Sequence, residues 1–380
     1  MFLGLQLSVF AAAAARPDLT PMTDHRLIHD ADCLNTGTRP VITADHFVTP
    51  VEQFFTRSHA RIPTIDPATW RLEVGGRCTR PKTFTLDDLR VFSRRTVAAT
   101  LVCAGLRRNE FLLLGPLPGE LPWGPEAAST GEWSGIPLRD VLDQVGIGDG
   151  ARYVEFTGLD TVERHGRQFG FGGSVDLDKA LNGDVVLATE LNGAPLPAVH
   201  GFPMRAVVPG WIGARSVKWL GRITLLDEPS ANYFQREAYR VQHEPDPAKP
   251  RDVTAGVAMS AVPLNAAILD PSPEQHVRAG SVRVRGWAMG STARPVTTVQ
   301  VSPNDGRDWL PARITTPGAG YTWTFWEATL DLAPGRHTLV ARAADGVAAP
   351  QSPDLRDSWN VKGYGNNAWH RVAILVRPNA

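Results

Sequence analysis

Cys103 and the two arginines after it are the residues whose types and spacing point most clearly to chemistry. In the stretch TLVCAGLRRNEF, Cys103 ends an apolar run, and Arg107 and Arg108 follow shortly after it. A buried cysteine is most often a small apolar core residue. Two guanidinium groups nearby would instead favour a thiolate, which acts as a nucleophile or as a soft metal ligand. No local signature of a cysteine hydrolase supports the nucleophile, and the spacing alone leaves the core residue and the metal ligand open.

A second candidate is a cationic segment punctuated by glycines, residues 200–226. Its cations after His200 are Arg205, Arg215, Lys218 and Arg222. The same stretch contains no acidic residue, and Gly210 and Gly213 permit tight turns between strands. In a chain of zero net charge this local excess predicts a bound anion, whereas the alternative is a solvated strand face. The segment matches neither a Walker A loop nor a dinucleotide fingerprint, so an ordinary nucleotide is not favoured.

Three shorter stretches add polar residues that an anion site would use. Arg57 and His59 lie in FFTRSHARIP, a loop-like segment where such residues are often only surface charges. Asp160 ends a predicted strand in FTGLD. Tyr239 lies in QREAY, and its phenol can donate a hydrogen bond to an oxyanion or relay a proton.

The composition describes an ordinary globular protein of two or three domains. The 380 residues are 43% hydrophobic and 21% charged, with 39 basic and 39 acidic side chains. Because the charges balance, a surface for nucleic acid is not expected. The three cysteines form no C-x-x-C pair, which argues against a zinc ribbon or an attached c-type haem. Their odd number argues against a disulfide framework, although one pair remains open.

The first 44 residues predict an extended arm that is disordered or removed. Residues 1–15 resemble the apolar part of an export signal but lack a basic start. We therefore expect a cytoplasmic protein, with a periplasmic one as the alternative. No other run approaches the roughly 18 apolar residues that a membrane span requires, so stable membrane insertion is not expected.

Residues 45–255 predict a first domain that mixes short helices with strands. Helices are expected at 85–92, which begins with a capping box, and after Pro137, where apolar residues follow a helical period. An Asn-Gly pair at 192–193 predicts a turn. Strands are expected at 152–157, 184–190, 203–208 and 217–226.

Residues 256–380 predict a second domain built from strands. A charged, proline-rich stretch, HEPDPAKPRD, lies just before it and reads as a linker. Alternating short strands and frequent turns over residues 263–377 are typical of an immunoglobulin-like β-sandwich. The fold class is therefore α+β and rich in β-structure. The expected strands lie in SVRVRGWAM, VTTVQVSPNDG, YTWTFWEATL, HTLVARAAD and WHRVAILV.

Taken together, three motifs resemble the sulfite oxidase family of molybdenum enzymes. They are CAGLRRNE, HGFPMRAVVPGWIGARSVKWLGRI and WNVKGYGNNAWHRV, and the resemblance covers about residues 45–377. It implies a molybdopterin-binding catalytic domain followed by an immunoglobulin-like dimerisation domain, and hence a homodimer. It also implies one Mo-molybdopterin per chain, with Cys103 as the protein ligand of molybdenum.

The same resemblance assigns further residues. Those implied to hold the pterin and its phosphate are Phe55, Thr56, Arg57, Ser58, His59, Asp160, His200, Arg205, Ser216, Val217 and Lys218. Those implied to act on the substrate are Arg57, Arg108, Tyr239 and Lys362. Two positions depart from the family pattern: Leu106 replaces the usual asparagine, and Lys362 replaces an arginine. Lysine cannot offer the planar fork of a guanidinium, so the substrate follows less directly from the resemblance than the cofactor.

The expected activity is oxidation of sulfite to sulfate by oxygen-atom transfer. No haem-binding His-Pro-Gly-Gly segment or flavin domain is recognised, so the chain is expected to hold neither group. The electrons would then pass to an external acceptor such as a cytochrome. The alternatives are a reductase of nitrate or of an S-oxide on the same scaffold, and a non-catalytic anion-binding protein.

Overall fold

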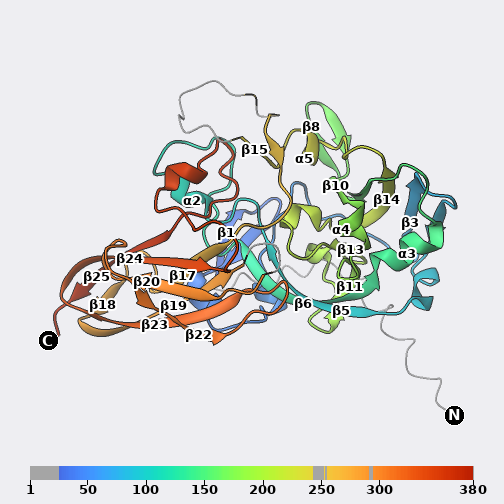
Figure 1. Ribbon diagram of the computed structural model, residues 1–380. Coiled ribbons are helices and arrows are strands. Elements are labelled where there is room, and N and C mark those ends of the chain that lie inside the picture. Colours follow the sequence, from blue (N-terminus) through green and yellow to red (C-terminus); the bar gives the residue numbers. More distant parts are fainter. Residues whose placement is uncertain (1–24, 243–251, 253–254, 291–293, 380) are drawn as a thin grey trace, which may run out of the picture.

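The computed structural model describes residues 25–242, 252, 255–290 and 294–379, which form two parts side by side (Figure 1). We call residues 25–242 the N-terminal part and residues 255–379 the C-terminal part. The apolar segment 1–15 and nearly all of the predicted linker lie outside the described residues. Among the described residues, no helix has both the length and the apolarity needed to cross a membrane.

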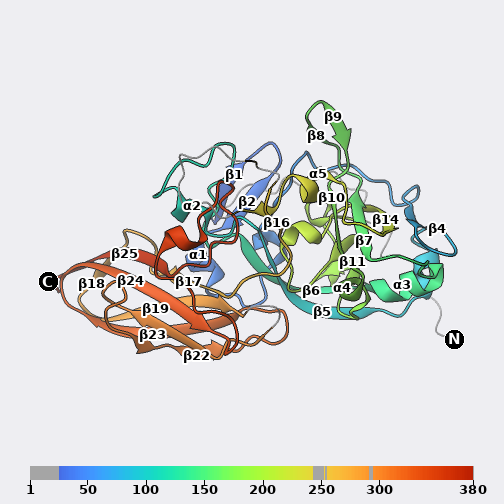
Figure 2. The same cartoon turned by 45° about the horizontal axis from the view of Figure 1, so that its top comes forward.

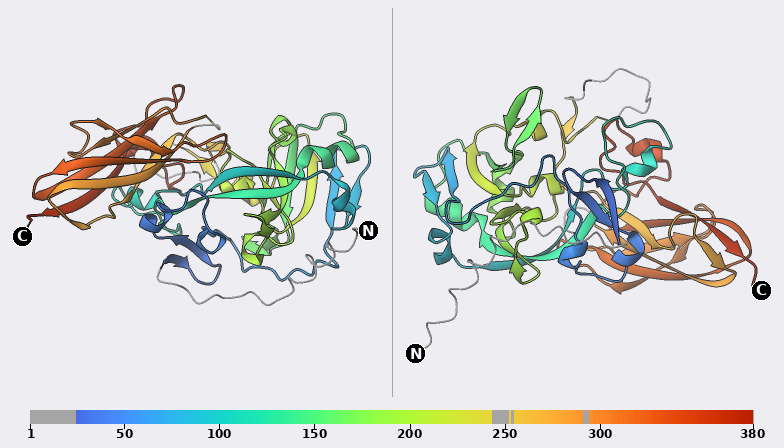
Figure 3. Two further views of the ribbon diagram at one scale, coloured as in Figure 1. Left: turned by 90° about the horizontal axis from the view of Figure 1, so that it is seen from below. Right: turned by 180° about the vertical axis from the view of Figure 1, so that it is seen from behind.

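The N-terminal part contains two five-stranded sheets. The first has the order β10 (Gly172–Asp176), β7 (Tyr153–Gly158), β14 (Leu220–Leu226), β3 (Leu72–Gly76) and β4 (Lys82–Phe84). The second contains β12 (Ala194–Pro195), β11 (Val186–Leu191), β6 (Ala128–Pro137) and β5 (Arg95–Val102), with β13 (Arg205–Val207) also paired to β11. The long strands β5 and β6 run from this part toward the C-terminal part (Figure 3). Since β5 ends at Val102, it delivers Cys103 to the junction of the two parts.

Short helices and turns cover these sheets. They are η1 (Val51–Gln53), η2 (Asp88–Val91), α3 (Leu138–Val145), α4 (Leu177–Leu181), η3 (Ala198–His200), η4 (Gly213–Arg215) and α5 (Tyr233–Arg236). The helix predicted after Pro137 is confirmed as α3, whose apolar stripe is buried in the core. The predicted capping box is present, because Thr85 Oγ1 accepts from the Asp88 amide at 3.1 Å, but the segment forms a 3-10 turn. The turn at Asn192 and Gly193 is confirmed by their positive φ angles of 53° and 77°.

The N-terminal arm predicted over residues 1–44 is wrong for residues 25–44. They form β1 (Arg26–Asp30), β2 (Asn35–Thr38) and the turn of helix α1 (Pro40–Thr43), and every residue of β2 is buried. The hairpin of β8 (Val162–Arg164) and β9 (Arg167–Phe169), by contrast, projects away from the rest of the molecule (Figure 2). The sequence of β2 is polar, so no apolar alternation revealed it.

The C-terminal part is a sandwich of two sheets, as predicted. One sheet has the order β17 (Asn265–Asp270), β19 (Gly280–Met289), β23 (Thr324–Leu332) and β22 (Arg313–Thr316). The other has the order β18 (His276–Arg278), β25 (His370–Arg377), β24 (Gly335–Ala344), β20 (Thr298–Ser302) and β21 (Leu310–Pro311). The strands β15 (Arg240–Val241) and β16 (Val257–Ala258) pair where the two parts meet in sequence. A separate apolar core lies between the two sandwich sheets.

The two parts share a buried interface. One apolar cluster includes Leu101 of β5 together with Trp287 and Trp323 of the sandwich. A polar network adds to it around Arg107, which precedes helix α2 (Arg108–Phe111) and is fully buried. The Arg107 guanidinium donates to both carboxylate oxygens of Glu110 at 2.7 Å and to Asn265 Oδ1 at 2.7 Å. The segment after η6 (Leu355–Ser358) thereby packs against the loop that follows Cys103.

Candidate functional site

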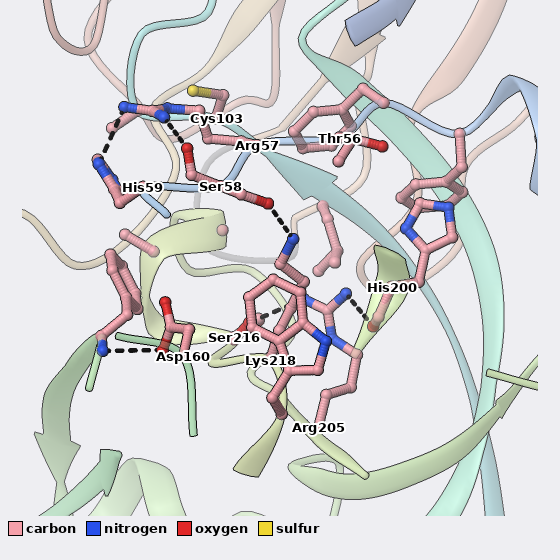
Figure 4. A pocket seen from close by; sticks show the side chains of 18 of the residues that line it. Thr56, Arg57, Ser58, His59, Cys103, Asp160, His200, Arg205, Ser216 and Lys218 are labelled. Atoms are coloured by element: carbon pink, nitrogen blue, oxygen red, sulfur yellow. Dashed lines mark hydrogen bonds between the residues drawn. The ribbon is translucent and has the colours of Figure 1, made fainter. Parts of the chain in front are cut away.

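A pocket opens beside Cys103 in the N-terminal part. Its wall is formed by Phe54, Phe55, Thr56, Arg57, Ser58, His59, Leu101, Cys103, Ala104, Asp160, Phe171, His200, Arg205, Gly213, Ala214, Ser216, Lys218, Trp219 and Tyr239. Figure 4 shows the labelled polar side chains pointing toward a common space. Most of the site residues named from the sequence are therefore brought together.

The loop of residues 54–59 is fastened on both sides. The Phe55 amide donates to Ser129 Oγ at 3.1 Å, and the Ser58 amide donates to Asn35 Oδ1 at 2.7 Å. Asn35 is completely buried in β2 and also accepts from Arg57 Nη1 at 3.3 Å. Sequence reasoning missed Asn35 because it treated the N-terminal segment as an arm.

Cys103 presents its sulfur at one side of the pocket and is 7% exposed. The Gly105 amide points at its Sγ at 3.4 Å, a contact that stabilises negative charge on sulfur. All three cysteines are free. No group of three or more His, Cys, Asp or Glu side chains among the described residues is arranged to hold a metal ion.

Two buried cations line the opposite wall. Arg205 donates to the carbonyl oxygens of His200 at 3.1 Å and Ser216 at 2.7 Å, and Lys218 Nζ donates to Ser58 Oγ at 2.7 Å. Neither makes a salt bridge to a carboxylate among the described residues. Burial lowers the pKa of Arg205 to about 9, and burial together with Arg205 lowers the pKa of Lys218 well below its usual value. A bound anion would remove this penalty, and phosphate matches both donors.

Burial disfavours the charged forms of the acidic and imidazole groups of the pocket. Asp160 Oδ1 accepts from the Phe171 amide at 3.0 Å, and burial raises the pKa of this carboxyl. Burial also lowers the pKa of His200 to about 3, so its imidazole is uncharged at neutral pH. The pocket is lined by Arg57, Arg205 and Lys218, and Asp160 is the acidic residue among its lining residues.

Arg57, His59 and Tyr239 form a hydrogen-bonded chain with a defined direction. Arg57 Nη2 lies 3.2 Å from His59 Nδ1, and His59 Nε2 lies 2.7 Å from the Tyr239 hydroxyl. Because a guanidinium only donates, Nδ1 must accept, and the imidazole proton therefore sits on Nε2 and points at the phenol oxygen. Burial lowers the pKa of His59 and raises the pKa of Tyr239 to about 12. The phenol thus stays protonated, and its O–H is free to donate to a ligand.

Three predicted residues do not line the pocket. The Val217 side chain is 1% exposed and packs in the core, because Ser216 and Lys218 on either side of it face the pocket. Arg108 and Lys362 lie behind the pocket wall, where both pair with Glu120. The expectation that Arg107 acts on the Cys103 thiol is also wrong, because its guanidinium is bound in the interface between the parts.

Comparison with known proteins shows to which protein family this chain is related. The family model described as oxidoreductase molybdopterin binding domain matches residues 59–234, and the Mo-co oxidoreductase dimerisation domain matches residues 257–377. Sulfite oxidase from Gallus gallus is 37% identical over 341 residues, which cover 87% of this chain and 73% of that protein. This chain belongs to the sulfite oxidase family. It is accordingly a molybdopterin-dependent oxidoreductase, as the motifs predicted.

Two further comparisons define the extent of the relationship. Mitochondrial sulfite oxidase from Homo sapiens is 35% identical and covers 90% of this chain, and the chain spans 64% of that protein. The crystal structure of the sulfane dehydrogenase SoxCD from Paracoccus pantotrophus superposes with a TM-score of 0.78 at 25% identity. That match covers 92% of this chain and 87% of the other. The predicted fold of a sulfite oxidase-type domain followed by a β-sandwich is confirmed.

The pocket of this sulfite oxidase family member fits molybdopterin. Thr56 Oγ1 is buried in the pocket wall without a hydrogen-bond partner among the described residues, as expected for a group that a ligand completes. Cys103 offers one soft sulfur donor, and Arg205 and Lys218 offer charge to a phosphate. The donor types and their separation on opposite walls suit a cofactor that brings metal and phosphate together.

Proposed function

We propose that this enzyme oxidises sulfite to sulfate, with one Mo-molybdopterin per chain and Cys103 as the protein ligand of molybdenum. The observation that carries the proposal is the arrangement of one buried cysteine opposite buried cations that have no carboxylate partner in the part of the chain that the structure describes. In the overall reaction sulfite and water give sulfate, two protons and two electrons. When bound, the molybdenum cofactor supplies the oxygen-atom transfer and takes up the two electrons.

The side chains of the pocket divide into two groups in this proposal. Arg205, Lys218 and Ser216 hold the phosphate end of the cofactor, since they lie away from Cys103 (Figure 4). Arg57 and Tyr239 face the substrate. The Arg57 guanidinium attracts the sulfite oxygens, and the Tyr239 hydroxyl, which receives a hydrogen bond from His59, donates its own proton to a second oxygen.

Arg108 and Lys362 add positive charge at longer range. Arg108 lies over the ring of Tyr364 at 5.2 Å, and Tyr364 stacks on Tyr239 at a centroid distance of 5.3 Å. Their field favours an anion in the pocket even though neither side chain lines its wall.

The proposed partners follow from the chemistry and from the C-terminal part. The electrons leave one at a time to an external acceptor such as a cytochrome, with no haem or flavin held by this chain. A homodimer forms through the dimerisation domain that matches residues 257–377. We propose a cytoplasmic location, with the periplasm as the alternative.

Steady-state turnover of the molybdenum-loaded protein tests the activity. Sulfite is supplied with an artificial electron acceptor, and nitrate is supplied with an artificial donor, while molybdenum content is measured on the same sample. Fast sulfite turnover with little nitrate reduction supports the proposal. Nitrate reduction without sulfite turnover would establish the reductase instead. Full molybdenum loading with neither activity would contradict both.

A further inference from the structure

Glu120 occupies an unexpected position for an acidic residue in an anion-binding enzyme. Its Oε2 lies 3.2 Å from Arg108 Nη2, and its Oε1 lies 3.1 Å from Lys362 Nζ. The Glu120 side chain is 13% exposed and that of Arg108 is 3% exposed, so water screens their interaction weakly. We call Arg108, Glu120 and Lys362 the charge cluster.

The charge cluster is one layer of side chains away from the pocket. The Arg108 guanidinium packs so closely on Gly105 that an added Cβ would lie 2.5 Å from its Cζ. Gly105 is the residue whose amide points at Cys103 Sγ. On its other side Arg108 covers Tyr364, which stacks on the pocket residue Tyr239. The charge of this cluster therefore acts on the same space as Cys103 and Tyr239.

The three substrate cations implied by the resemblance are consequently unequal. Arg57 makes no salt bridge to a carboxylate among the described residues, and its guanidinium contacts Asn35, the Ser58 carbonyl and His59. Arg108 and Lys362 share the carboxylate of Glu120, and Arg108 also donates to the carbonyl oxygens of Lys362 and Leu121. The cluster thus contributes one net positive charge instead of two, and its donors are already engaged.

We propose that Glu120 is a specificity-determining residue that weakens the binding of doubly charged oxyanions in the pocket. The inference rests on the proposed sulfite-oxidising function for its substrate. Glu120 raises the KM for sulfite and, for the same reason, limits retention of the sulfate product. Since Coulomb energy scales with the charge of the ligand, the effect is larger for a dianion than for a monoanion.

The variant Glu120→Gln tests the proposed role of Glu120, because it removes the negative charge and keeps a hydrogen-bonding side chain of the same size. We expect the KM for sulfite and the inhibition constant of sulfate to fall by roughly three- to tenfold. The inhibition constant of chloride, a monoanion, should fall by clearly less. These differences should shrink as ionic strength rises.

Two control variants are measured together with Glu120→Gln. Glu120→Asp keeps the negative charge and should keep the sulfate inhibition constant near that of the wild type. Glu73 on β3 forms an exposed pair with Arg222 on β14, at the far end of the N-terminal part (Figure 1). Glu73→Gln should therefore leave both the KM for sulfite and the sulfate inhibition constant unchanged. Glu120→Met serves as a second neutral variant if Glu120→Gln does not fold.

The outcomes separate this inference from the proposed activity. An unchanged or raised sulfate inhibition constant in the neutral variants overturns it, as does an equal change for chloride and sulfate. If the wild type carries molybdenum but does not oxidise sulfite, the proposed function fails. Calorimetric titration of sulfate into wild type and Glu120→Gln then still decides the role of Glu120, and tighter binding to the variant supports it.

Discussion

Lys218 and Arg205 are buried cations that no carboxylate among the described residues pairs with in a salt bridge. Among the described residues, Lys218 Nζ has Ser58 Oγ and the Val199 carbonyl as its hydrogen-bond acceptors, and it lies over the ring of Trp219 at 4.3 Å. Burying a charge without an ionic partner costs free energy. The cofactor-free protein therefore carries a penalty that a phosphate group would relieve.

This penalty leads to an expectation for Lys218→Met. Without cofactor, the variant should melt a few degrees higher than the wild type, because a desolvated ammonium has been replaced by an apolar chain of similar length. Its molybdopterin content after expression should fall sharply. Thermal melting and pterin fluorescence check the two effects. A lower melting temperature in the cofactor-free variant would contradict this account of Lys218.

Cys103→Ser tests the metal ligand. A serine oxygen is a poorer and harder donor, so sulfite turnover should fall by more than the roughly 10–100-fold typical of losing an outer-shell partner. Pterin should remain bound, because its proposed contacts come from other residues. Turnover, pterin and molybdenum are measured together. Turnover near the wild-type value at full molybdenum loading would exclude Cys103 as the ligand.

For individual residues, the sequence was sufficient to predict the side chains that line the pocket, but not the residues that hold those side chains in place. Cys103, Arg205 and Lys218 belong to long motifs whose order and spacing are distinctive. Asn35 and Glu120 act through three-dimensional contacts, Asn35 with Ser58 and Glu120 with Arg108 and Lys362. No local pattern marks such a partner, because its role depends on the fold bringing it there.

At the level of elements, the backbone before α2 separates the two arginines. Arg107 adopts a left-handed conformation with a φ of 60°, which an L-residue seldom adopts without compensation. Here the compensation is its set of hydrogen bonds to Glu110, Asn265 and the Ala368 carbonyl. Arg107 thus fastens the sandwich, while Arg108 pairs with Glu120 behind the pocket wall.

Arg107→Met should therefore destabilise the whole protein. Removing one partner of a buried ion pair leaves Glu110 uncompensated, which typically costs about 3–5 kcal/mol. The loss should appear in chemical denaturation of the full chain. Arg94→Met is the matched control, because Arg94 pairs with Glu190 on the surface and its removal should cost at most about 1 kcal/mol. Equal effects of the two substitutions would refute the role of Arg107.

The strands of the sandwich and helix α3 were predictable because each buries one apolar face against a core. The alternation of apolar and polar residues in the strands, and the helical spacing of apolar residues in α3, can be seen directly in the sequence. Strand β2 has the sequence Asn-Thr-Gly-Thr and is buried by polar contacts on both sides. Its structure is set by hydrogen-bonding partners, such as Thr56, which sequence periodicity does not reveal.

On the scale of the whole molecule, stability depends on a buried histidine of the C-terminal part that responds to acid. His370 in β25 accepts from the Ile268 amide through Nδ1 at 2.9 Å, and burial lowers its pKa to about 4. The native protein therefore keeps this imidazole neutral, whereas an unfolded chain protonates it at its ordinary pKa of about 6.5. Below that pH the unfolded state binds the extra proton, so stability falls as pH decreases toward 4.

We expect His370→Gln to make stability less dependent on pH in this range. Each unit of pKa shift corresponds to about 1.4 kcal/mol, so His370 alone accounts for roughly 3 kcal/mol of the acid loss. Denaturant unfolding of variant and wild type at pH 7.5 and pH 4.5 measures the difference. Burial also lowers the pKa of His59 and His200, and these remain in both proteins. Parallel losses in the two proteins would show that His370 does not contribute.

The contact of the Gly365 amide with the Ala104 carbonyl at 2.8 Å has a consequence for biosynthesis. The residue next to Cys103 is held by a segment that the ribosome makes about 260 residues later, as is Arg107 through Ala368. A nascent chain of which only the N-terminal part has left the ribosome lacks the hydrogen bonds from Gly365 and Ala368. We therefore expect insertion of the cofactor in the cell to follow synthesis of the C-terminal part, and truncated translation products to stay empty.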